Sequence, residues 1–265
     1  MSAAAEARLS ELDRVLDAQE ASPELAAELF AVADLLGGQA QLRNAMADPT
    51  VADDRRRDFA RTVFGGRIGA AATAVVVAAA GLRWGTASGL GAAIDRQGVR
   101  ALFGHAHAAG TLDAVEDELF RFGRTVVADQ ALRRALDNRT APVAVRQTLV
   151  SDLIEGRTSA DTVALARRAV ATAAVSFEAT VEAYLGLAAE IRARAIATIT
   201  VARPLEADQK ERLQAALQRQ LGRQVNLHII IDPSVLGGAR VQVGDEVIEG
   251  TVAGRLAAAE KQLTQ

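Results

Sequence analysis

Few residues in this chain have the types and spacing that chemistry would need. His105 and His107 lie close together, but two residues apart on a helix they point to different faces. The chain has no cysteine, and neither histidine has a carboxylate four residues further on. The lack of further ligands near these histidines argues against a metal site, which needs several ligands facing one point.

Nucleotide chemistry is equally poorly supported. The segment Gly89-Leu90-Gly91-Ala92-Ala93-Ile94 lacks the third glycine of a dinucleotide fingerprint, and no glycine-rich loop ends in Lys-Ser or Lys-Thr. Arg55-Arg56-Arg57 lies among three aspartates and the formal net charge is -3, so these arginines fit a solvated helix face better than a nucleic-acid patch. We therefore predict no catalytic residues, no cofactor and no nucleic-acid partner.

The composition favours thin, closely packed helices. The 265 residues are 50% hydrophobic but only 3% aromatic, which argues against a deep aromatic-lined pocket. Nothing argues for secretion, since cysteine is absent and the amino terminus lacks the basic start and apolar core of a signal peptide. Residues Gly69 to Leu82 are uncharged but fall short of the roughly 20 residues that span a membrane, so we predict a buried helix there.

An internal repeat organises the helical part of the chain. Shifting the sequence by ninety positions places Glu28-Leu29-Phe30 on Glu118-Leu119-Phe120 without a gap. Arg56 falls on Arg146 in the same register, and a stripe of apolar residues at helical spacing recurs in both copies. The sequence therefore predicts a duplicated helical module.

Each copy is expected to form a run of short helices. In the second copy we predict helices over 94–109, 112–128, 130–136, 141–154 and 161–172, followed by a longer helix over 175–194. In the first copy the matching helices start near Ala5, Pro23, Gln39, Val51 and Gly69. Residues Gly81 to Gly89 form the best linker candidate, and a hinge there would let the orientation of the two modules vary.

The tail of the chain breaks the helical pattern. Strands are predicted over 196–201 and 225–231, an amphipathic helix over 204–221, and a hairpin that turns at Gly244-Asp245. Thr251 is a candidate N-cap for a closing helix over 252–262. The fold class is thus mostly α, with tandem helical bundles of five to six helices over 1–90 and 91–194 and a small α/β domain over 195–265.

Several of these residues resemble a known family. The tail pattern of Asp232, Ser234, Gly237-Gly238, Gly244-Asp245 and Gly250-Thr251-Val252 is similar to the delta subunit of F-type ATP synthases, the bacterial relative of the mitochondrial oligomycin sensitivity-conferring protein. Val99-Arg100-Ala101-Leu102-Phe103 resembles the first-helix motif of that family. The resemblance covers residues 98 to 263, and the first 90 residues look like the duplicated module of actinobacterial forms.

The resemblance implies a non-catalytic stator role. In the family, the helical domain holds amino-terminal helices of α subunits in a groove, and the carboxy-terminal domain holds the b subunits of the peripheral stalk. It therefore implies α and b subunits as partners and a peripheral location on the cytoplasmic face of the plasma membrane, without direct membrane insertion. Carried over by position, the residues of the α-subunit groove would be Val99, Leu102, Phe103, Ala106, Val163, Leu165 and Ala166. Those of the stalk contact would be Val241, Val243, Val247, Ile248 and Leu256.

Sequence leaves several alternatives open. Each of these residues fits ordinary core packing as well as it fits a partner contact. The first copy could hold a second α-subunit terminus, brace the stalk, or only thicken the contact. A different class of function, a general helical adaptor that binds amphipathic helices of another complex, also fits the pattern.

Overall fold

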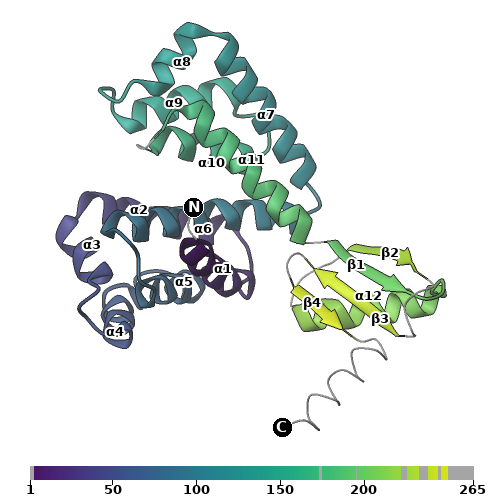
Figure 1. Ribbon diagram of the computed structural model, residues 1–265. Helices are drawn as coiled ribbons and strands as arrows, with labels where there is room; N and C mark the ends of the chain where they lie inside the picture. The colour runs from purple at the N-terminus through teal and green to yellow at the C-terminus, as the bar shows by residue number, and fades with distance from the viewer. Residues whose placement is uncertain are drawn as a thin grey trace. The chain divides into compact units, whose positions relative to one another are not determined.

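A computed structural model describes residues 3–172, 175–194, 196–221, 226–232, 238–243 and 246–249. The chain divides into two compact units, Met1–Ala188 and Ala189–Gln265. The first is helical and the second is α/β, which confirms the fold class predicted from the sequence (Figure 1).

The helical unit contains two copies of a five-helix pattern. The first copy comprises α1 (Ala3–Asp17), α2 (Pro23–Gly38), α3 (Ala40–Ala47), α4 (Asp53–Phe64) and α5 (Ala70–Gly81). The second comprises α6 (Ala87–Ala108), α7 (Leu112–Ala128), α8 (Gln130–Asp137), α9 (Val143–Ile154) and α10 (Ala160–Ala171), and α11 (Phe177–Arg194) follows. The bounds of α3, α4 and α5 recur ninety residues later in α8, α9 and α10, so the predicted repeat is confirmed.

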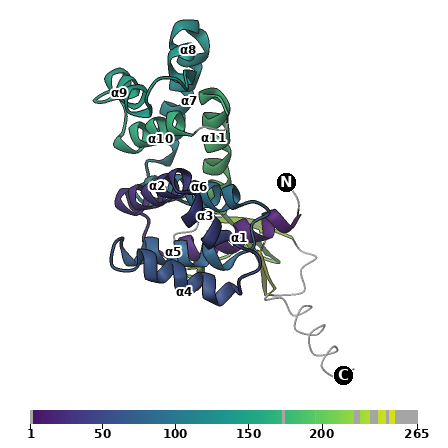
Figure 2. The ribbon, with the colours of Figure 1, turned by 90° about the vertical axis from the view of Figure 1, so that its left-hand side faces the viewer.

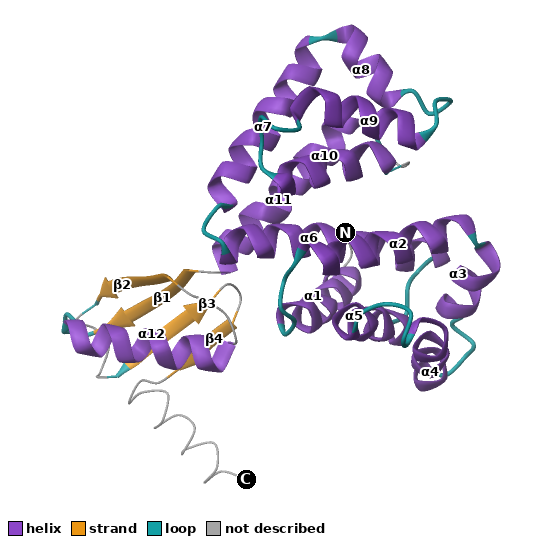
Figure 3. Cartoon of the chain, turned by 180° about the vertical axis from the view of Figure 1, so that it is seen from behind, coloured by secondary structure: helices purple, strands orange, loops and turns teal. Residues whose placement is uncertain are grey.

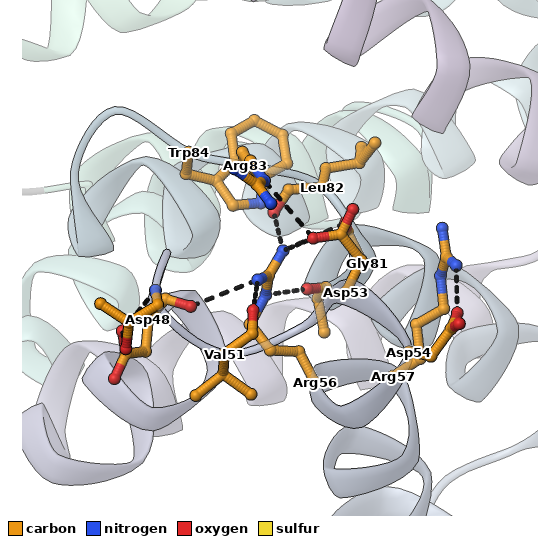
Figure 4. Close-up of polar contacts among 12 residues, drawn as sticks. Asp48, Val51, Asp53, Asp54, Arg56, Arg57, Gly81, Leu82, Arg83 and Trp84 are labelled. Atoms are coloured by element: carbon orange, nitrogen blue, oxygen red, sulfur yellow. Dashed lines mark hydrogen bonds and ion pairs between the residues drawn. The ribbon is translucent and has the colours of Figure 1, made fainter.

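A buried arginine closes each copy in the same way. Arg56 Nε donates to the carbonyl oxygen of Ala80 at 2.8 Å, and its guanidinium also donates to the carbonyls of Gly81 and Leu82 (Figure 4). Its equivalent Arg146 donates to Val170 O at 2.6 Å, ninety residues beyond Ala80. Because the last carbonyls of a helix have no intrahelical donor, these arginines satisfy the ends of α5 and α10.

A glutamate ties the second helix of each copy to the start of the fifth. Glu28 Oε1 accepts a hydrogen bond from Gly69 N at 2.9 Å, and Glu118 Oε2 accepts one from Ser159 N at 3.0 Å. Glu118 also accepts hydrogen bonds from the hydroxyls of Ser159 and Thr162. Burial raises the pKa of Glu118, but these hydrogen bonds outweigh it and hold that pKa below its ordinary value.

The long helix α6 belongs to both copies. It contacts α1, α2, α3 and α5 on one side and α7 and α10 on the other, and Figures 1 and 2 both show α2 running beside it. The helix starts seven residues earlier than predicted because Thr86 caps it, accepting a hydrogen bond from Gly89 N at 3.2 Å. The linker candidate therefore shrinks to residues 82–86, and residue 90 lies within α6.

A cluster of charged side chains fixes α1 to α6. Asp13, only 1% exposed, lies between Arg96 and Arg100, with its Oδ1 3.2 Å from Arg100 Nε. Burial raises the pKa of Asp13, but the two guanidinium groups outweigh it and hold that pKa below its ordinary value. The ion cluster adds a specific polar contact to the apolar packing between the two helices.

The α/β unit has two layers. Its sheet has the order β2 (Asn226–Ile231), β1 (Ile196–Val201), β3 (Ala239–Val243) and β4 (Glu246–Glu249), with β1 parallel to β2 and antiparallel to β3. Helix α12 (Ala207–Leu221) lies across one face of the sheet (Figure 3). Its Leu217 joins Ile199, Val201 and Val241 in the core between the layers. The predicted closing helix over 252–262 lies outside the described residues.

The uncharged segment over 69–82 forms α5, as predicted, and buries Val75 and Val76 completely. None of the described helices combines the length and the apolar character that a membrane crossing requires.

Candidate partner-binding groove

A groove runs between the first copy and the second. Its volume is about 630 Å³, and its two long walls are α2 and α10. Ala27, Phe30 and Ala31 contribute to the α2 wall, Val163 and Ala164 to the α10 wall, and Leu102 of α6 lies between them. We refer to this surface as the α2–α10 groove.

Close packing of α2 on α6 sets the position of the first wall. A β-carbon built at Gly98 of α6 would lie 2.5 Å from Phe30 Cε1, so only glycine allows Phe30 to lie this close to the helix. The absence of a side chain at Gly98 thus lets α2 lie close to α6.

One arginine joins the two walls. Arg168 of α10 lies 2.8 Å from Asp34 of α2 through its Nη1, and its Nε pairs with Asp95 of α6. The same guanidinium carbon is 4.8 Å from the ring centroid of Phe30, within range of a cation–π contact. Burial lowers the pKa of Arg168, but the two carboxylates outweigh it and hold that pKa above its ordinary value, so the arginine stays charged.

Near the start of α2 the groove has a polar rim. His105 Nδ1 lies 3.0 Å from Asp161 Oδ2, and Asp161 lines the groove. Within the described part of the chain there is no group of three or more side chains that could hold a metal ion. The arrangement offers shape and charge to a partner and has the character of a binding surface.

Of the seven residues that the sequence proposes for contact with the α subunit, two line the groove and five do not. Val163 lines the groove and is partly exposed, and Leu102 also lines it but is 1% exposed. The remaining five are completely buried in the helical core: Val99, Phe103, Ala106, Leu165 and Ala166. Residues of α2, which belongs to the other copy, also line this groove and were not among the residues proposed from the sequence.

The proposed stalk residues lie in the α/β unit. Val241 is 5% exposed and packs under α12, in register with Ile199. For Val243 of β3 and for Val247 and Ile248 of β4 the structure describes the backbone alone, and Leu256 lies outside the described residues. Their role in a stalk contact stays a prediction.

The fold so described is a tandem helical repeat followed by a small α/β domain. The family model for the ATP synthase delta (OSCP) subunit matches residues 94–263. The chain is 46% identical to ATP synthase subunit delta of Streptomyces avermitilis, covering 91% of this chain and 88% of that protein. It is 41% identical to ATP synthase subunit delta of Kineococcus radiotolerans, covering 98% of this chain and 96% of that protein.

The chain belongs to the ATP synthase delta (OSCP) subunit family, as its tail motif predicted. The family model begins inside α6, whereas the Kineococcus protein matches almost the whole chain. The similarity to that relative therefore extends over the first helical copy as well.

Proposed function

We propose that the chain is a non-catalytic stator subunit of a proton-translocating F-type ATP synthase. Its helical unit would hold the catalytic head, and its α/β unit would hold the b subunits of the peripheral stalk. Membership of the delta family is the observation that carries this proposal. The subunit would lie at the cytoplasmic face of the plasma membrane, held there through the complex.

The α2–α10 groove suits the head contact in its shape. Alanines on both walls allow a helix to approach closely, and the partly exposed Phe30 and Val163 add larger apolar surface. An amphipathic helix binds such a surface by laying its apolar face into it. The partner we propose is the amino-terminal helix of an α subunit.

Calorimetric titration of the full chain with a synthetic peptide of the α-subunit amino terminus tests this proposal. We expect saturable binding. A scrambled peptide of the same composition serves as the control and should give no saturable heat. Absence of binding, with circular dichroism showing a folded chain, would reject the head contact and favour a general helical adaptor.

The stalk contact has its own test. A soluble fragment of the b subunit should co-elute with the full chain in size-exclusion chromatography and should still do so when the α-subunit peptide is present. Competition between the two partners would contradict the proposal, because a stator must hold head and stalk at the same time.

A further inference from the structure

Because of the repeat, α2, which lines the groove, can be compared with its equivalent α7, ninety residues later. The positions of α2 that line the groove recur ninety residues later on α7, where Ala27 and Ala31 are replaced by Asp117 and Arg121. Asp117 and Arg121 form an ion pair at 2.6 Å on the surface of the second copy. Six residues of α2 line the groove, and one of them, Asp34, is charged. Of the six equivalent residues of α7, five are charged: Asp113, Glu116, Asp117, Arg121 and Arg124.

Packing within the chain does not explain the alanines of α2. Ala27 and Ala31 are both exposed, one helical turn apart, and both line the α2–α10 groove. Charged residues at these positions would meet water, as their equivalents on α7 do. The small side chains keep the groove open, which is what a bound partner would require.

The groove has the length for a short amphipathic helix, and its α10 wall carries an exposed cation. At 1.5 Å per residue, its lining on α2 from Pro23 to Asp34 extends about 17 Å, or roughly three turns of helix. Arg167 on the α10 wall is exposed, and no carboxylate of the described residues forms an ion pair with it. An acidic side chain on the occupant would complement this guanidinium.

We propose that α2 of the first copy is the second wall of the partner site, so that the duplicated module itself selects the bound helix. The occupant is an amphipathic helix of about three turns with an acidic residue beside its apolar stripe. This inference rests on the proposed head contact and adds to it the side chains that recognise the partner.

The decisive variant transplants the α7 pair into the groove. In the full chain, Ala27→Asp combined with Ala31→Arg should weaken binding of the α-subunit peptide by at least about tenfold, because the occupant would have to displace or bury charged groups. The control is Asp117→Ala combined with Arg121→Ala, which should change the dissociation constant by less than about twofold. All four substituted positions are exposed, so both double variants should fold. Circular dichroism and the urea midpoint would check this.

A second variant tests the charge of the occupant. Arg167→Glu should weaken peptide binding by about two- to fivefold, and the loss should shrink as salt is raised. Arg124→Glu on α7 is the matched control and should leave binding unchanged. Equal weakening by both would overturn the assignment of an acidic residue facing Arg167.

The outcomes separate the two proposals. Saturable binding by the wild-type chain together with undiminished binding by the groove double variant would overturn the α2 wall and leave the stator function standing. Absence of binding by the wild-type chain would overturn the head contact and the wall with it. Binding of a second copy of this chain in the groove, seen as a groove-dependent dimer by sedimentation, would also overturn the proposal.

Discussion

Among the described residues, Arg56 of the first copy donates to five carbonyl oxygens, whereas its equivalent Arg146 donates to two, those of Leu136 and Val170. Around Glu28 and Glu118 the difference runs the other way, since only the second copy adds hydroxyl donors. The paired positions and their roles are the same in both copies, but the number of contacts is not. The repeat thus fixes which residues join the helices of a copy, whereas the number of hydrogen bonds that these residues form differs between the copies.

The largest expected effect tests the two arginines against each other. Arg56→Ala should destabilise the chain by roughly 4 kcal/mol, and Arg146→Ala by roughly 2 kcal/mol, because each leaves two buried carbonyls without a donor and the first also removes the donor of three part-buried carbonyls. Urea unfolding followed by circular dichroism measures both. Hydrogen exchange should show the loss of protection first in α5 for Arg56→Ala and first in α10 for Arg146→Ala. Equal losses would mean that the extra contacts of Arg56 add no stability.

A smaller effect is expected at the helix contact that shapes the groove. Gly98→Ala places a methyl group against Phe30 and should cost about 1–3 kcal/mol. Gly186→Ala, in α11, has no atom within 4 Å of the added carbon and should stabilise by up to about 1 kcal/mol through helix propensity. The thermal midpoints of the two variants should move in opposite directions. A stabilising Gly98→Ala would show that α2 does not need its close approach to α6.

The smallest effect concerns pH. Because the pKa of Glu118 is lowered on folding, its contribution is fully present above the ordinary glutamate pKa and is lost as the pH falls through the folded value. Glu118→Gln should therefore reduce stability at pH 7 and have less effect at pH 3. Urea midpoints at both pH values measure this. A loss of the same size at both pH values would show that the charge of Glu118 is not responsible.

Much of the fold could be predicted from the sequence. The strand over 196–201 has the predicted bounds, because β-branched residues alternate there in a period of two. The ninety-residue register placed α3, α4 and α5 on α8, α9 and α10 because turn and cap residues such as Gly66 and Gly156 recur with it, both at φ +74°. The start of α6 was missed because the glycines of residues 81–89 indicate a linker, whereas the cap at Thr86 and the packing of α6 against α2 stabilise a helix there.

The candidate site was less accessible to sequence reasoning. The groove residues were assigned to two helices of one copy, and Phe103 and Leu165 proved to be fully buried. The groove is also lined by α2, some seventy residues earlier than Phe103, and periodicity within a helix carries no information about such a contact. The sequence nevertheless marks this surface, since Ala27 and Ala31 of the first copy stand where the second copy has the charged residues Asp117 and Arg121.

The helix α6 has a consequence for how this chain can be cut. Its Leu90 and Ile94 are completely buried, and α6 packs on four helices of the first copy. A truncation that begins at residue 85 would therefore bare an apolar helix face as well as remove a module, and its failure to assemble would say little about partner binding. The two copies are successive in sequence but not separable in space, so substitutions at the surface are the cleaner way to ask what the first copy does.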